Sequence, residues 1–266
     1  MPPLALVGNL SFDIVDGGPP RIGGAPIHCG RALRMLDARA TVLARCARAD
    51  RERFRHGFAR LGLPVALRAD DGDTTTFAFT YEGDRRVMRV TRIGAVWAPA
   101  DVTAVPRGAW VHVGELLRGD FPAETLAELA RGRRVSLDGQ GLTRVRSVGP
   151  LRLEPAPERT EILRHVSILK LAVEEAEALA GGIEPAALAA LGPAEVVVTF
   201  GSDGSLVVAN GRATEVRARH VPVDPTGSGD AFAAAYLVSR ASGHVPAAAA
   251  RRATAVVGDM LRQRLR

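Results

Sequence analysis

The sequence predicts an α/β fold in which a mostly parallel sheet is covered by helices and carries one inserted β-hairpin. Short apolar runs alternate with amphipathic stretches over 4–61 and again over 110–261, a rhythm typical of β-α-β units. Between 65 and 92 the rhythm gives way to two segments of alternating polarity around a turn. No linker or internal repeat divides the 266 residues, so we expect one domain over 1–266.

The first elements follow from the apolar pattern and its punctuation. A strand at 4–7 precedes a loop with Asp13, and the turn-forming pair Gly23 and Gly24 leads into the next helix. The insertion at about 65–92 contains alternating runs at 74–81 and 85–90, joined by a turn at Glu82-Gly83-Asp84. Further elements of this half are a helix at 27–36, a strand at 41–44 and a helix at 51–61. The hairpin could be a lid, a dimerisation sheet or an edge hairpin.

The second half repeats the alternation. Three prolines leave 144–161 without an assigned element. We expect strands at 110–113, 135–137, 168–169, 195–200 and 205–208, and helices at 123–130, 173–180, 231–239 and 247–261.

Composition excludes several classes of protein. No apolar stretch is long enough to span a membrane, and the N-terminus lacks the pattern of a signal peptide, so we expect a cytoplasmic protein. The net charge of +6 comes from scattered arginines without a nucleic-acid-binding motif, which leaves nucleic-acid binding a minor reading. Cys29 and Cys46 fit a reducing compartment, and no histidine or cysteine spacing indicates a zinc site.

The run from Val223 to Phe232, which reads Val-Asp-Pro-Thr-Gly-Ser-Gly-Asp-Ala-Phe, is the most informative segment. The backbone N–H groups of Gly227, Ser228 and Gly229 can converge where a helix begins, which makes an anion site. Asp230 follows in the first helical turn, where it can accept a proton from an attacking hydroxyl. A Gly-rich helix start is common, but the whole run favours phosphoryl transfer.

Other polar residues follow predicted strands, where ligands bind in open α/β sheets. Each has a plainer interpretation: Asp13 as a surface acid, Asp138 as a cap, His28 as a packed side chain, and Glu175 as a dipole-favoured acid. The sequence contains no P-loop, no G-x-G-x-x-G after the first strand, no protein-kinase motifs and no G-x-S-x-G elbow. Any phosphate site must therefore be the turn at 227–229.

These segments resemble the ribokinase/PfkB family of carbohydrate kinases. The run 223–232 is similar to the family's D-T-x-G-A-G-D signature, Gly23-Gly24 to its double glycine, and 196–204 to its nucleotide-side strand and turn. The resemblance implies a ribokinase-like, doubly wound sheet with helices on both faces and a β lid. It also implies transfer of a phosphoryl group from ATP, with Mg²⁺, to a hydroxyl.

The resemblance also implies a role for individual residues. Asp230 is the catalytic base, and Gly227, Ser228 and Gly229 form the anion hole. Asp224 and Thr226 adjoin the loop that binds a monovalent cation such as K⁺ in some members. A homodimer through the lid is a further expectation. Implied substrate-binding residues are Asp13, Gly23, Gly24, His28, Asp138, Gln140 and Arg144; nucleotide-binding residues are Lys170, Thr199, Gly201, Asp203, Gly204 and Thr226; metal-binding residues are Glu175 and Asp224.

The chain departs from the common pattern in two places. His28 stands where many members carry asparagine, and Ala172 replaces the asparagine of an N-x-x-E motif whose glutamate is Glu175. The stretches 136–141 with Arg144, 168–176 and 223–227 look most like the inositol-kinase branch. The sequence therefore indicates a kinase of a small sugar or cyclitol. A nucleoside kinase and a catalytically weak nucleotide- or sugar-binding module on this fold are the alternatives.

Overall fold

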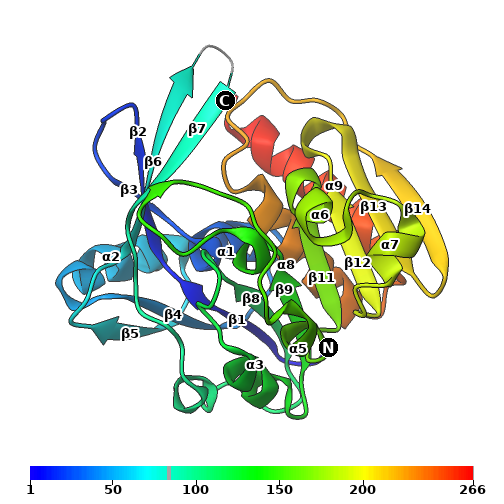
Figure 1. Cartoon of the computed structure of the whole chain (residues 1–266), viewed down its shortest axis with the longest axis horizontal. Helices are drawn as coiled ribbons and strands as arrows, with labels where there is room; N and C mark the ends of the chain where they lie inside the picture. Colours follow the sequence, from blue (N-terminus) through cyan, green and yellow to red (C-terminus); the bar gives the residue numbers. More distant parts are fainter. Residues whose placement is uncertain (83–84, 266) are drawn as a thin grey trace.

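The computed structural model describes residues 1–82 and 85–265, which form two sheets (Figure 1). The larger sheet has nine strands in the order β14-β13-β12-β11-β9-β8-β1-β4-β5. The strands β5, β4, β1, β8, β9, β11 and β12 of this sheet run parallel, and β13 and β14 add an antiparallel edge. The strands are β1 Leu4–Asn9, β4 Thr41–Ala47, β5 Val65–Asp70, β8 Trp110–Gly114, β9 Arg134–Asp138, β11 Ile168–Ala172, β12 Glu195–Thr199, β13 Gly204–Ala209 and β14 Arg212–Arg217.

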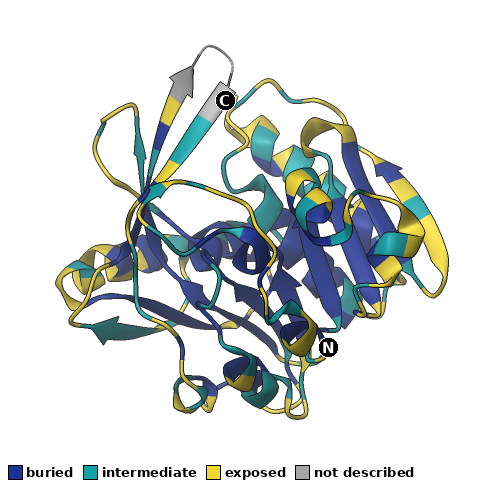
Figure 2. Cartoon of the chain, in the orientation of Figure 1, coloured by how far each residue is buried: buried dark blue, intermediate teal, exposed yellow. Residues whose placement is uncertain are grey.

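Helices cover both faces of this sheet, as expected (Figure 1). Strands with two covered faces must be apolar throughout, and the central strands are buried almost along their whole length (Figure 2). One layer contains α1 Ala25–Met35, α2 Arg51–Leu61, α8 Ser228–Ala241 and α9 Pro246–Gln263. The other contains α3 Ala123–Ala130, α5 Arg159–Leu163, α6 Val173–Ala180 and α7 Pro185–Ala189. Short helices complete the set: α4 Gln140–Thr143, η1 Arg48–Asp50, η2 Pro99–Val102 and η3 Gly201–Asp203.

The second sheet stands away from the main body and is larger than the expected hairpin (Figure 1). Its order is β10-β7-β6-β2-β3, so the hairpin of β6 and β7 is flanked by strands from two other parts of the chain. The strands are β2 Ser11–Val15, β3 Arg21–Gly23, β6 Thr75–Glu82, β7 Arg85–Arg92 and β10 Gly149–Pro150.

Two expectations about this region change. Asp13 lies in β2, not in a loop, because β2 pairs in parallel with β6. The paired residues are more than sixty positions apart in the sequence, and no local pattern reveals this pairing. Val65–Asp70 pairs with β4 and belongs to the main sheet, so the insertion starts later than residue 65. Gly83 and Asp84 of the expected turn lie outside the described residues.

The strands β1 and β8 and the start of α1 approach one another very closely. A Cβ on Gly8 of β1 would lie 2.5 Å from the carbonyl oxygen of Gly114 of β8. A Cβ on Gly114 would lie 2.1 Å from the Cβ of Ala25, at the start of α1. These glycines therefore let α1 begin directly on the carboxyl ends of two central strands.

Two further findings concern the chain as a whole. Cys29 and Cys46 are both buried and free. Within the described residues, no helix combines the length and apolar character needed to cross a membrane.

Candidate active site

The N-terminus of α8 is the centre of the candidate site. Gly227 precedes the helix with φ 78°, in the left-handed region that glycine adopts without strain. A Cβ on Gly227 would lie 2.3 Å from Nδ1 of His28, so the imidazole packs directly against this turn. In the described part of the chain, the N–H groups of Gly227, Gly229 and Asp230 have no backbone acceptor. They can therefore bind an anion, which the helix dipole also attracts.

Ser228 differs from the expectation for the anion hole. Its N–H donates to the carbonyl of Pro225 at 2.9 Å and closes the turn before the helix. The first bond of the helix runs from the N–H of Ala231 to the carbonyl of Gly227 at 3.0 Å. Two of the three predicted donors remain available, and the N–H of Asp230 joins them.

Asp230 lies in the first turn of α8 and carries the group with the most unusual environment. Its Oδ1 is shielded from solvent and has no hydrogen-bond partner among the described residues. Burial, and then the negative charge of Asp138, raise the pKa of Asp230 to about 7, although Lys170 and Arg144 act to lower it. A carboxyl group that titrates near neutrality is well suited to accept and release a proton.

An ion pair lies beside Asp230. Nζ of Lys170 on β11 is 3.1 Å from Oδ2 of Asp138, its register partner on β9, and both residues are buried. A Cβ on Gly229 would lie 3.1 Å from the same Nζ, so the ammonium group faces the first turn of α8. Burial disfavours the charge, but the acids Asp138, Glu175 and Asp230 outweigh it and raise the pKa of Lys170. Lys170 therefore supplies a fixed positive charge next to the anion site.

The double glycine lies close to Asp13. Gly24 has φ 94° and begins α1, and a Cβ there would lie 2.6 Å from the carbonyl oxygen of Asn9. A Cβ on Gly23 would lie 2.7 Å from Oδ2 of Asp13. Glycine at both positions thus lets the backbone pass close to the Asp13 carboxylate, which also accepts from the Ser11 hydroxyl at 3.3 Å.

His28 lies one turn into α1 and connects this substrate side to the anion site. Burial first, and then the positive charge of Arg31, lower the pKa of His28 to about 4, while Asp13 acts to raise it. The imidazole is therefore neutral at physiological pH. Because Nη1 of Arg31 lies 3.4 Å from Nδ1, the neutral ring accepts there and carries its proton on Nε2.

The end of β9 contributes a third group of predicted residues. The N–H of Gln140, which begins α4, donates to Oδ1 of Asp138 at 3.3 Å. Burial acts to raise the pKa of Asp138, but Lys170, His112 and Arg144 lower it overall, so this carboxylate stays ionised. Arg144 also acts on the pKa of Asp230 and of Glu175, which places its guanidinium near all three acids.

Glu115 is a buried acid at the site that the sequence analysis missed. It follows β8 directly, and neither carboxyl oxygen has a hydrogen-bond partner in the described structure. Burial, followed by the charges of Asp120 and Asp138, raises the pKa of Glu115 well above its ordinary value. A Cβ on Gly141 would lie 1.6 Å from its Oε2, so Glu115 fills the space over α4. Its place after a buried strand is the signal that also indicated Asp138.

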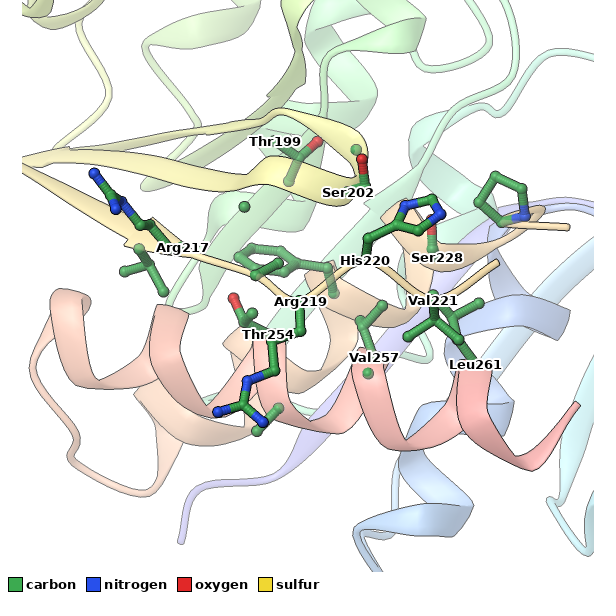
Figure 3. A pocket seen from close by; sticks show the side chains of 18 of the residues that line it. Thr199, Ser202, Arg217, Arg219, His220, Val221, Ser228, Thr254, Val257 and Leu261 are labelled. Atoms are coloured by element: carbon green, nitrogen blue, oxygen red, sulfur yellow. The ribbon is translucent and has the colours of Figure 1, made fainter. Parts of the chain in front are cut away.

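A cavity of about 820 Å³ lies on the other side of the anion site, between β12, β14 and α9 (Figure 3). Ser228 and Gly229 form one end of it, and Thr199, Gly201 and Gly204 of the predicted nucleotide side line it. Its walls combine apolar side chains with a basic rim, in which Arg217, Arg219 and His220 are visible in Figure 3. Lys170, Asp203 and Thr226, also predicted for this side, do not line the cavity.

The two residues expected at a metal are engaged in local structure. Oε2 of Glu175 accepts from the N–H of Ala172 at 2.8 Å and so caps α6. Oδ1 of Asp224 accepts from the N–H and the hydroxyl of Thr226, at 3.0 and 2.6 Å. Nowhere in 1–82 and 85–265 do three or more His, Cys, Asp or Glu side chains form a cluster that could hold a metal ion. The acids present therefore fit an ion held mainly by the phosphates of a donor, not a site built by the protein alone.

Comparison with known proteins identifies relatives over nearly the whole chain. The model of the pfkB family of carbohydrate kinases matches residues 21–261. A pyrophosphate-dependent kinase in the ribokinase family, complexed with a pyrophosphate analogue and myo-inositol, is 24% identical, with a TM-score of 0.86 over 97% of this chain and 95% of that one.

Two nucleotide-bound structures are similar as well. The fructokinase of Vibrio cholerae O395, bound to fructose, ADP and calcium, is 21% identical, with a TM-score of 0.72 over 96% of this chain and 90% of that one. The ribokinase of Arabidopsis thaliana, complexed with ribose and ATP, is 19% identical, with a TM-score of 0.72 over 96% and 91%. At these identities the structures establish a common fold.

Proposed function

Because the chain belongs to the pfkB family of carbohydrate kinases, we propose that it transfers the γ-phosphoryl group of ATP to a hydroxyl of a small sugar or cyclitol. One observation carries this proposal. The carboxyl of Asp230 has no hydrogen-bond partner for Oδ1 and a pKa of about 7, and it lies beside backbone N–H groups that can bind a phosphoryl group.

The proposed proton transfer uses Asp230 alone. Its ionised carboxylate accepts the proton of the acceptor hydroxyl as that oxygen forms a bond to the γ-phosphorus. The bond between the γ-phosphorus and the bridging oxygen breaks, and ADP leaves with the electron pair. A base with a pKa near the working pH combines enough ionised form with enough basicity to drive the transfer.

The proposed charge stabilisation comes from groups that are fixed before substrate binds. The N–H groups of Gly227, Gly229 and Asp230 have no backbone acceptor in the described structure, Gly229 lines one end of the cavity, and the ammonium of Lys170 faces Gly229. Preorganised donors of this kind stabilise the charge that spreads over the oxygens of the transferring phosphoryl group. We therefore assign Lys170 to the phosphoryl group, in place of the nucleotide contact expected from the sequence.

Mg²⁺ is part of the proposal as a partner of the donor phosphates. When bound, it would neutralise negative charge on those phosphates, with Glu175 and Asp138, two buried acids near Lys170, beside it. Asp224 is less suited to this role, because its carboxylate holds the Thr226 turn.

The acceptor is proposed to lie between Asp13, the double glycine, His28, Gln140 and Arg144. The carboxylate, amide and guanidinium groups of these side chains suit an acceptor with several hydroxyls around a ring. The neutral His28 can donate from Nε2, which replaces the amide that many family members use there. Myo-inositol is our first candidate, because a structurally similar kinase was crystallised with it.

The donor is proposed to be ATP, although that same relative is described as pyrophosphate-dependent. The cavity of about 820 Å³ extends far beyond the anion site and has apolar walls that include Val216, Phe232 and Val257. A pyrophosphate would use only the polar end of such a cavity. An adenosine group would cover the apolar walls, which supports a nucleotide donor.

The experiment is a crossed panel of donors and acceptors with the purified chain and Mg²⁺. ATP and pyrophosphate would each be combined with myo-inositol, ribose, fructose and inosine, and the phosphorylated product identified by mass spectrometry. We expect product from ATP with a cyclitol or sugar. Product from pyrophosphate alone would refute the donor assignment, and product from inosine alone would make the chain a nucleoside kinase. If no pair reacts, the chain is a binding module and the proposed activity is wrong.

A further inference from the structure

The loop that leads into α8 is held from outside by Arg264. Nη1 of Arg264 donates to the carbonyl oxygen of Asp224 at 2.5 Å, and Nη2 donates to the carbonyl oxygen of Thr226 at 3.1 Å. The planar guanidinium thus bridges two carbonyls on either side of Pro225. Arg264 follows α9, whose end lies next to this loop (Figure 1).

The two carbonyls are placed to control the anion site. Thr226 directly precedes Gly227. Between Asp224 and Thr226, the carbonyl oxygen of Pro225 accepts the hydrogen bond from the N–H of Ser228 that closes the turn. Displacement of either carbonyl would rotate the peptide groups that follow it, including the N–H groups proposed to bind the phosphoryl group. The guanidinium therefore fixes the geometry of the turn through its backbone, without contact to substrate.

Asp224 and Thr226, whose carbonyls Arg264 bridges, adjoin the loop where the family resemblance places a monovalent cation. Carbonyl oxygens are suitable ligands for such an ion, but here both accept hydrogen bonds from a group that is always charged. Other cations lie nearby. The positive charge of Arg264 is among the causes that lower the pKa of both Arg31 and His28, after burial in each case. A second cation at these carbonyls would be repelled by Arg264 and Arg31, so the residues present do not fit a bound K⁺.

We propose that Arg264 is a built-in replacement for the monovalent cation of this loop. It neutralises and bridges the carbonyls of residues 224 and 226, so that the turn at 227–229 forms without K⁺. Arg264 is thus a positioning residue for the proposed kinase reaction, and its effect on turnover rests on the proposed function. The effect of Arg264 on the loop does not rest on the proposed function, because its hydrogen bonds exist in the free protein.

The test compares Arg264→Met and Arg264→Lys with Arg252→Met, which removes an exposed arginine from α9, the helix that Arg264 follows. The first readout is hydrogen exchange of peptides that cover residues 222–231, measured in KCl and in tetramethylammonium chloride. Wild type and Arg252→Met should exchange equally slowly in both salts. Arg264→Met should exchange faster in tetramethylammonium, and K⁺ or millimolar guanidinium should restore protection. Arg264→Lys should be intermediate, because one ammonium group cannot bridge two carbonyls as a guanidinium does.

The second readout is turnover with the acceptor found in the panel. A displacement of about 1 Å at a reacting group can cost about 10²-fold in rate, so Arg264→Met should lose up to that factor in kcat, with a smaller change in KM. K⁺ or guanidinium should restore it. The proposal would be overturned if the wild-type protein needed K⁺ for slow hydrogen exchange of this loop and for turnover. It would also be overturned if Arg264→Met had the same hydrogen exchange and the same turnover as wild type. If wild type phosphorylates no acceptor, the proposed function fails, and the exchange experiment still decides the role of Arg264.

Discussion

Asp230→Asn should make the protein more stable at neutral pH while it removes the proposed base. Asparagine has nearly the same shape as aspartate but carries no charge. In the folded protein the pKa of Asp230 is raised from 3.8 to about 7, mainly by burial, so the ionised carboxylate destabilises the fold. This cost is fully present above pH 7, decreases as the pH falls from 7 to 4, and is absent below pH 4.

The size of the effect follows from that interval. At about 1.4 kcal/mol for each pKa unit, ionised Asp230 costs roughly 4 kcal/mol at pH 8. The amide of asparagine would be left without one partner, which costs about 1–3 kcal/mol. The net gain is roughly 2 kcal/mol, or an increase in Tm of about 4–8 °C for a chain of this length. Near pH 5 most of the charge cost has gone, and the gain should disappear.

The assay is thermal unfolding of both proteins at pH 8 and at pH 5, at constant ionic strength. Asp71→Asn is the control, because that side chain is 85% exposed and should not change Tm at either pH. An Asp230→Asn protein that is no more stable than wild type at pH 8 would refute the reasoning. So would a gain that is equally large at both pH values, because it could not come from the titration of Asp230.

Two further predictions concern the groups around Asp230. In wild type, kcat/KM should rise with pH with an apparent pKa near 7, because the ionised carboxylate is the active form, and it should fall about tenfold per unit below pH 6. Lys170→Met removes a positive charge that lowers the pKa of Asp230, so the rise of kcat/KM should move to higher pH in this variant. A wild-type kcat/KM that is constant from pH 6 to 8, or a Lys170→Met profile that coincides with wild type, would contradict this prediction. Gly227→Ala should lower kcat by about 10²–10³, because its Cβ would lie 2.3 Å from His28 and disturb the anion site. Gly108→Ala is the matched control, because φ is 75° at Gly108 and no atom lies within 4 Å of the added Cβ. Both variants therefore share a backbone strain of about 1–2 kcal/mol, and only Gly227→Ala should lose activity. Equal losses of activity in the two variants would point to general destabilisation.

Much of the fold could be predicted because its elements carry local signals. The helix Arg51–Leu61 has an amphipathic pattern and ends at Gly62 in the left-handed conformation, and its predicted bounds are those of the structure. The pairing of β2 with β6 could not be predicted in this way. It joins Ser11 to Thr75, and the short alternation of β2 is no stronger than that of many loops.

The candidate site was predictable where a strand end or a motif marks it. Gly227, Gly229 and Asp230 lie at the start of α8, and Asp138 and Gln140 lie at the end of β9. The family resemblance implied that Lys170, on β11, contacts the nucleotide. The structure places that strand next to β9, so Lys170 pairs with Asp138, and this order of strands cannot be inferred from local periodicity. Arg264 carries no sequence signal at all, since it is one arginine among many.

The most direct test of the proposed function is turnover by Asp230→Asn with the acceptor and donor that wild type uses. We predict that kcat falls at least about 10²–10³-fold, that KM for the donor changes little, and that the variant remains folded. An Asp230→Asn protein that phosphorylates the same acceptor at the wild-type rate would contradict the assignment of Asp230 as the base, and with it the account of this site.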